Sequence, residues 1–348
     1  MAAKTRYKPI IITDTEKLTE AEWLEYRLKG IGGSEAAAVL GLSPFCTARD
    51  VYYNKIGVNP VTDDNQNRVA KKMGHLLEDI VAEIFSVKTK LKIRKDKNMY
   101  AHPEFPFMTA NIDYLIEMPD GSPAVLECKT SNHYSQDKWA DGSVPINYEL
   151  QVRHYMSVMN IDTAFCACLY GNNEKDFVYQ RIDRDFDYEY NIIEQEKYFW
   201  EEYVQKQIEP PYSENGELVL ESIRRHCGKA DMSAPAVNLD VKMSEAIEKY
   251  LALRDRKLDL DHQAQDIDSE MKRHIAPIIE FMGTSCKAVC KSETGEYIVS
   301  NKPSYREGIN KDGLDMMKAL NPKLYGEYVT TTESRRLSVI KSAVSEAG

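Results

Sequence analysis

Two carboxylates and one lysine stand close together near the middle of this 348-residue sequence. Asp113 lies on a strand-like run, 108–118, while Glu127 and Lys129 lie on a second run, 124–130, after a Pro-Asp-Gly-Ser turn. The pattern predicts a β-hairpin, in which residues two apart on a strand share a face. Carboxylate oxygens suit Mg²⁺, and a neighbouring lysine could orient or deprotonate a water and stabilise a phosphate. The alternative is a chance set of charged strand residues.

Three more polar residues extend this pattern. Glu78 lies on the largely apolar segment 68–87, whose hydrophobic spacing predicts a long, well-buried helix. Gln151 and Tyr155 are four residues apart within 147–160, so a helix there puts them on one face. Glu78 is therefore either solvated at a helix edge or directed into the metal site. The combined order and spacing is far more restrictive than the carboxylate–lysine pattern alone.

A glycine-rich segment, Gly-Ile-Gly-Gly-Ser, occupies residues 30–34. Ser34 is a suitable N-cap for a short helix of small residues, 35–40. Small residues at a helix N-terminus can form an anion-binding site. The alternative is an ordinary tight turn with no ligand.

The elements that must position these residues alternate between helix and strand. Helices are predicted at 16–29, 47–56 and 185–207, and strands at 163–170 and 176–182. The segments therefore include both helices and strands in the first 210 residues.

A Glu-Pro-Pro sequence at 209–211 marks the predicted boundary between a domain at 1–210 and an accessory region at 211–348. In the accessory region, 243–282 is predicted to be helical, with an apolar seam of heptad type. The seam residues are Leu260, Ala264, Ile267, Met271, Ile275, Ile278 and Met282. We expect a helical hairpin or a coiled-coil arm, followed by a small β unit formed by 288–302.

The net charge of −10 does not exclude nucleic acid, because the charge is unevenly distributed. Residues 1–100 carry 17 basic and 13 acidic residues, whereas residues 101–210 carry 8 and 20. No apolar run is long enough for a membrane helix, and the first residues lack the form of a signal peptide. Seven irregularly spaced cysteines indicate reduced thiols rather than a zinc site. These features predict a cytoplasmic protein.

Five segments, taken in order, resemble the YqaJ family of phage-type recombination nucleases. They are GIGGSEAAAVLG at 30–41, GHLLEDIVAEIF at 74–85, ANIDYLI at 110–116, LECKT at 126–130 and PINYELQVRHYM at 145–156. This family is the lambda-exonuclease-like branch of the PD-(D/E)xK nucleases. The resemblance implies a mixed α/β fold with a restriction-endonuclease-like core, in which a mixed central sheet is flanked by helices. It also implies Mg²⁺-dependent cleavage of duplex DNA, 5′→3′ from an end.

The resemblance also implies roles for individual residues. Asp113 and Glu127 would bind the metal, with the Cys128 backbone carbonyl and Glu78 assisting, and Lys129 would position the attacking water. Gln151 would orient water or phosphate beside Tyr155 in the site wall. The residues implied to hold a DNA 5′-phosphate are Arg27, Gly33 and Ser34.

Cofactors and partners follow from the same resemblance. It implies two Mg²⁺ ions per site, for which Mn²⁺ can substitute, and a ring-shaped homotrimer that encloses DNA. Double-stranded DNA ends would be the substrate, and a single-strand annealing recombinase would use the product, in a bacterium or a phage-infected host cell.

Three hypotheses stay open from the sequence. The first is a DNA exonuclease, the second is an endonuclease with the same site, and the third is a DNA-end-binding module without turnover. The intact set of Glu78, Asp113, Glu127 and Lys129 favours an enzyme, because a protein that only binds DNA has no need of it.

Overall fold

The computed structural model describes residues 7–61, 68–171, 173–228, 230–292, 295–305 and 308–330. Two compact units divide between Met232 and Ser233, and each is described by itself. The division falls later than the boundary predicted near 210. The reason is that α7 (Gly216–Cys227) packs on the first unit, where Ser222 donates a hydrogen bond of 2.8 Å to Asp50.

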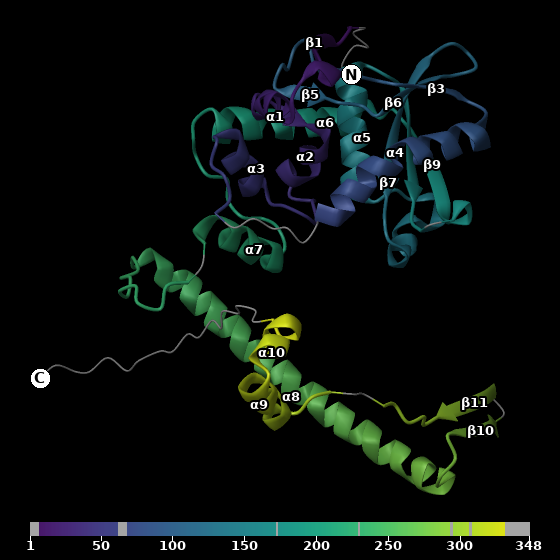
Figure 1. Ribbon diagram of the computed structural model, residues 1–348, viewed down its shortest axis with the longest axis vertical. Helices are drawn as coiled ribbons and strands as arrows, with labels where there is room; N and C mark the ends of the chain where they lie inside the picture. The colour runs from purple at the N-terminus through teal and green to yellow at the C-terminus, as the bar shows by residue number, and fades with distance from the viewer. Residues whose placement is uncertain are drawn as a thin grey trace, which may run out of the picture. The chain divides into compact units, whose positions relative to one another are not determined.

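A mixed five-stranded sheet forms the centre of the first unit (Figure 1). Its strands, in spatial order, are β3 (Lys92–Lys95), β6 (Tyr114–Glu117), β7 (Pro123–Thr130), β8 (Thr163–Leu169) and β9 (Phe177–Asp183). The β7–β8 pair is parallel and the other neighbours are antiparallel. The predicted mixed sheet flanked by helices is confirmed.

Helices cover both faces of this sheet. Residues of α4 (Arg68–Thr89) pack with Leu126 on one face, while residues of α5 (Ile146–Met159) pack with Val125 on the other. Successive strand residues face opposite sides of a sheet, so β7 serves both cores. The prediction that the long helix is well buried is only partly correct, because Leu76 is 62% exposed.

A second sheet of the first unit changes the predicted hairpin. Its strands, in spatial order, are β1 (Ile10–Asp14), β4 (Asn98–Ala101), β5 (Met108–Ala110) and β2 (Ile31–Gly32). The predicted first arm, 108–118, is therefore wrong as a single strand: its first part is β5 in this sheet, and its second part is β6 in the other. Asp113 lies between the two strands, where the chain passes from one sheet to the other.

The remaining helices of the first unit surround these sheets. They are α1 (Glu20–Leu28), α2 (Gly33–Val39), α3 (Ala48–Lys55) and α6 (Phe186–Tyr198), the last continued by a π-helical turn, Phe199–Val204. Thr19 and Thr47 accept hydrogen bonds from the third backbone N–H of α1 and α3. Such caps satisfy N–H groups that a helix start otherwise leaves unpaired.

The second unit contains one long helix, α8 (Lys242–Met282), which Figure 1 shows as an unbroken ribbon. It is a single arm rather than a helical hairpin. The predicted small β unit is confirmed as the antiparallel pair β10 (Lys287–Ser292) and β11 (Gly295–Ser300). Two short helices follow, α9 (Lys311–Leu320) and α10 (Pro322–Tyr328).

A buried ion pair joins three elements of the first unit. His154 on α5 lies 2.9 Å from Glu196 on α6 through Nδ1, and its Nε2 lies 2.9 Å from the Thr109 carbonyl oxygen on β5. Both side chains are fully buried. Burial alone would lower the pKa of His154, but the Glu196 carboxylate outweighs it and raises that pKa.

We predict that Glu196→Gln destabilises the first unit in a pH-dependent way. A histidine whose folded-state pKa is raised stabilises the fold most below its unfolded pKa of about 6.5, and that stabilisation is lost as the pH rises through the folded value. Breaking a buried pair costs about 3–5 kcal/mol. Urea unfolding at pH 6 and pH 9 should therefore show the larger loss at pH 6.

The exposed neighbour Glu194 supplies a matched control, because Glu194→Gln removes a carboxylate from the same helix without touching the pair. An equal loss of unfolding free energy at both pH values in Glu196→Gln would contradict the pair as described.

Candidate active site

The predicted carboxylates lie together, but they are not on the two arms of a β-hairpin as predicted. Asp113 follows the break between β5 and β6, and its Oδ2 accepts a hydrogen bond of 2.8 Å from the backbone N–H of Cys128 on β7. This bond holds Asp113 beside the strand that carries Glu127. The neighbouring strand β8 places Cys166 next to Glu127, so the cluster is closed off on that side.

Lys129 and Gln151 complete a hydrogen-bonded group around Glu127. The Lys129 ammonium donates to Glu127 Oε1 at 2.6 Å and to Gln151 Oε1 at 3.0 Å. Gln151 Nε2 donates to the same Glu127 oxygen at 2.6 Å and to the Tyr155 hydroxyl at 3.0 Å. The one-face spacing predicted for Gln151 and Tyr155 on α5 is confirmed.

Burial dominates the electrostatics of the two carboxyls. Desolvation raises the pKa of Asp113 well above its usual value, and the charges of Glu127 and Glu78 add to this effect. Desolvation also raises the pKa of Glu127, against the opposing charge of Lys129. Two carboxylates in one dry space therefore repel each other unless a proton or a cation lies between them.

Lys129 is held as a cation. Desolvation alone would lower its pKa, but the charges of Glu127 and Asp113 outweigh that effect and raise it. A protonated lysine donates hydrogen bonds and cannot accept a proton. Of the roles predicted for Lys129, orienting a water and stabilising a phosphate use the lysine in this protonated form.

One oxygen of the cluster fits a cation. Glu127 Oε2 is buried and has no hydrogen-bond partner among the described residues, and such an atom costs about 1–3 kcal/mol. Within the described ranges, no three His, Cys, Asp or Glu side chains form a metal-binding group. The two carboxylates of Asp113 and Glu127 suit Mg²⁺, because proteins often bind this ion through one or two carboxylates while water and phosphate supply its other ligands. The Cys128 carbonyl stays a predicted ligand.

Glu78 lies at the edge of the cluster. Its carboxylate is 3.3 Å from the Lys95 ammonium, and its charge acts on both Asp113 and Glu127. Lys95 on β3 also pairs with Asp79 at 2.6 Å. The structure thus brings Glu78 near the carboxylates and gives it a cationic partner, Lys95, that the sequence did not single out.

Tyr148 is a residue of the site that the sequence did not single out, and its ring centroid lies 5.1 Å from the Lys129 ammonium. A cation over an aromatic face is attracted by the ring electrons, so Tyr148 helps to hold Lys129 in place. It is three residues before Gln151 on α5, and this helical spacing could have identified it.

Arg27 and Ser34 also lie together, as the predicted phosphate site requires. An Arg27 guanidinium nitrogen donates to Ser34 Oγ at 3.1 Å, and the same group lies 3.4 Å from Glu35. The buried Lys55 ammonium pairs with Glu35 at 2.7 Å. Ser34 is not the N-cap that was predicted: α2 begins one residue earlier, at Gly33, with Gly32 as its cap. The phosphate-binding role stays a prediction.

Gly33 lies against the carboxylate site rather than in an open turn. A Cβ atom at this position would be 2.4 Å from the ring of Tyr155. The close approach of α2 to α5 therefore requires glycine here, and it connects the glycine-rich segment with the wall of the carboxylate cluster.

Comparison with known proteins identified related sequences. A model of the YqaJ-like viral recombinase domain matches residues 22–162, which include every predicted site residue. The uncharacterized protein YqaJ of Bacillus subtilis (strain 168) is 32% identical over 267 residues, which is 76% of this chain and 81% of that protein.

Two solved structures were among the matches. An alkaline exonuclease (LHK-Exo) from Laribacter hongkongensis matches with 17% identity and a TM-score of 0.44, over 54% of this chain and 94% of its own. A phage related exonuclease from Haemophilus somnus 129PT matches with 15% identity and a TM-score of 0.39, over 51% of this chain and 95% of its own.

Within the described residues, no helix has the length and apolar character to cross a membrane.

We predict that Gly33→Ala destabilises the first unit by about 1–3 kcal/mol, the usual cost of forcing an extra group into packed space. The added methyl group must displace the Tyr155 ring. Gly32→Ala is the matched control, because a Cβ there has no neighbour closer than 3.7 Å. Urea unfolding measures both.

A double-mutant cycle tests the assigned cause. In a Tyr155→Leu background, which removes the aromatic ring, Gly33→Ala should lower the unfolding free energy much less than in the wild type. An unchanged cost would show that the clash with Tyr155 is not responsible.

Proposed function

This chain belongs to the family of the YqaJ-like viral recombinase domain, and on that premise we propose that it is a Mg²⁺-dependent nuclease that degrades duplex DNA from its ends. The proposal includes assignment of the first unit to the PD-(D/E)xK nucleases, with Asp113 and the Glu127-Cys128-Lys129 run as the defining motif. Its main support is the buried cluster in which one Glu127 oxygen receives no hydrogen bond from the described residues.

Asp113 and Glu127 would hold the metal, with the Cys128 carbonyl and Glu78 contributing at the edge. Two Mg²⁺ ions per site are proposed, and Mn²⁺ would substitute because it takes the same oxygen ligands. Bound ions would offset the charge of the phosphate and the carboxylates and make a bound water more acidic.

The remaining side chains would position the reactants. The Lys129 ammonium can donate a hydrogen bond to a water or to a phosphate oxygen while Glu127 and Gln151 hold it. Gln151 is itself fixed by its bond to the Tyr155 hydroxyl. Because these contacts exist before substrate binds, little reorganisation is needed at the moment of reaction.

Arg27 and Ser34 would hold the 5′-phosphate at a duplex end. A phosphate there would replace Glu35 as the partner of Arg27, and Lys55 would keep Glu35 neutralised. The contact between Gly33 and Tyr155 supports this proposal, because it links the phosphate holder with the wall of the cluster. Cleavage from a held 5′ end would proceed 5′→3′ and leave a 3′ single strand for an annealing recombinase.

Four DNA substrates test the proposed activity: linear duplexes with a 5′-phosphate or a 5′-hydroxyl, single strands, and covalently closed circles. We expect degradation of 5′-phosphorylated linear duplex in Mg²⁺ and none in EDTA. Nicking of circles would identify an endonuclease instead, and binding of ends without any cleavage would identify a non-catalytic module.

We predict that Lys129→Ala lowers kcat by about 10²–10³-fold, the usual loss when one stabilising donor is removed, while DNA binding is kept. Lys175→Ala, which removes an exposed lysine after β8, is the control. Gel-shift and single-turnover cleavage measurements separate binding from chemistry. Full activity in Lys129→Ala would exclude this site.

We also predict that Glu127→Gln abolishes Mg²⁺ binding measured by calorimetry in the absence of DNA. An uncharged amide cannot balance the positive charge of the metal ion. Its oxygen can still accept the hydrogen bond from the Lys129 ammonium, so that contact is kept. Glu117→Gln, on the exposed end of β6, serves as the control. Retained metal binding in Glu127→Gln would mean that the metal lies elsewhere.

A further inference from the structure

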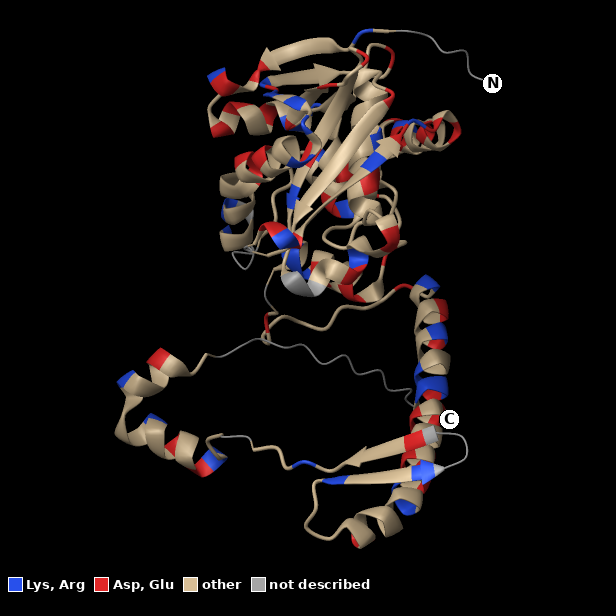
Figure 2. Cartoon of the chain, turned by 90° about the vertical axis from the view of Figure 1, so that its right-hand side faces the viewer, with Lys and Arg blue, Asp and Glu red and all other residues tan. Residues whose placement is uncertain are grey.

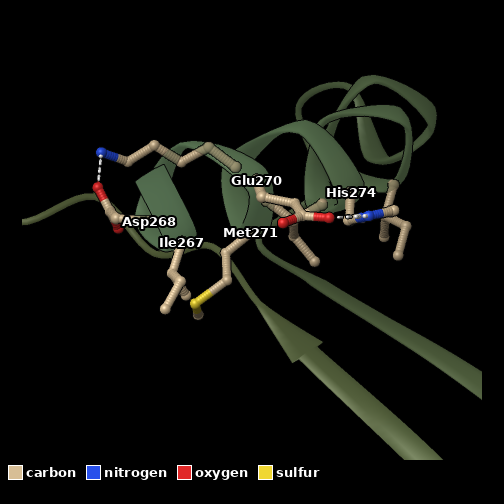
Figure 3. A pocket seen from close by; sticks show the side chains of 8 residues that line it. Ile267, Asp268, Glu270, Met271 and His274 are labelled. Carbon is tan, nitrogen blue, oxygen red and sulfur yellow. Dashed lines mark hydrogen bonds and ion pairs between the residues drawn. The ribbon is translucent and has the colours of Figure 1, made fainter. Parts of the chain in front are cut away.

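An exposed apolar stripe runs along α8 in the second unit. Its large side chains are well exposed, with Leu253 at 65%, Leu260 at 54%, Ile267 at 60% and Met271 at 64%. Figure 3 shows the side chains of Ile267 and Met271 directed to the same side of the helix. A stripe of this kind in a soluble helix indicates a surface that another helix covers.

The spacing of the stripe residues is the same when it is read from either end of the helix. Residues at its centre recur at alternating spacings of four and three: 253, 257, 260, 264, 267 and 271. Two copies placed antiparallel about residue 262 would pair Leu253 with Met271, and Leu260 with Ala264. The second pairing sets a large side chain against a small one, which favours close packing.

Charge along α8 changes sign within the stripe, between Lys257 and Asp259. Residues 254–257 contain three basic residues and one acidic residue, a net charge of +2. Residues 259–270 contain five acidic residues and no lysine or arginine, a net charge of −5. Figure 2 shows both signs of charge along this helix.

These charges lie on the flanks of the stripe. Arg254 and Asp268 are 14 residues apart, and so are Arg256 and Glu270, so each pair occupies one flank of a seven-residue repeat. Figure 3 shows Asp268 on one side of the stripe and Glu270 on the other. In the antiparallel register, the basic residue of each flank faces the acidic residue of the same flank in the second copy. In a parallel register Arg254 would approach Lys249 and Arg256 would approach Asp261, so repulsion at one place offsets attraction at the other.

We propose that α8 is an antiparallel self-association arm, which pairs two copies of this chain about residue 262. The apolar stripe supplies the free energy of association, because exposed ion pairs contribute only about 0–1 kcal/mol each. The charges select the antiparallel orientation, and Lys257 within the stripe fixes the register at a cost in stability. The arm would join two chains, whatever number of copies the first units assemble into.

Charge reversal in the full-length protein tests this proposal. One variant carries Arg254→Glu with Arg256→Glu, and the other carries Asp268→Lys with Glu270→Lys. Each alone should place like charges opposite each other and weaken association at least 10-fold, so the mass in sedimentation falls by half or more. An equimolar mixture should restore the wild-type mass, because the acidic arm of one variant then meets the basic arm of the other.

Two controls make the outcome decisive. Arg273→Glu lies on the opposite side of α8 and should leave the mass unchanged. Leu260→Ser with Ile267→Ser should lower the mass while circular dichroism shows that the helix is retained. The proposal is overturned by a wild-type mass equal to that of both charge variants, or by a mixture of the variants that stays dissociated. In the first case the stripe is covered within one chain or by a different protein.

Discussion

One oxygen of the buried Glu127 carboxylate accepts hydrogen bonds from Lys129 and Gln151, each at 2.6 Å, and the other oxygen has no donor in the part of the chain that the structure describes. This unequal sharing governs the first unit. Glu127 is buried because β7 is the middle strand of its sheet. Gln151 reaches Glu127 because α5 packs on the face of that sheet. Asp113 reaches it from the connection between the two sheets. The repulsion between the two carboxyls is relieved when a proton or a cation lies between them.

The grouping of the site residues in pairs was predictable from the sequence because it depends on local spacing. Glu127 and Lys129 are two apart on a strand, and Gln151 and Tyr155 are four apart on a helix, so their relative directions follow from backbone geometry. Glu35 and Lys95 could not be predicted in the same way. Their roles come from pairing with Arg27 and Glu78, partners that only the tertiary fold brings close.

The errors in the predicted fold have a common physical origin. Run 108–118 has continuous strand character, and nothing in its residue types indicates that β5 and β6 join different sheets. Ser34 is a good cap in isolation, but the close contact of Gly33 with Tyr155 fixes where α2 begins. The boundary near 210 rested on two prolines, whereas α7 beyond them is bound through Asp50. In each case a long-range contact decided against a correct local preference.

The position of Asp113 between the two sheets affects when the chain becomes a functional molecule. A folding intermediate that contains only β6 and β7 would leave Asp113 exposed to solvent, and Glu127 without Gln151. The carboxyls would then carry ordinary acidities and hold a cation weakly. On the proposed function, an assembled site therefore requires both sheets and α5 to be docked, so a partly folded chain would lack a site able to cut DNA.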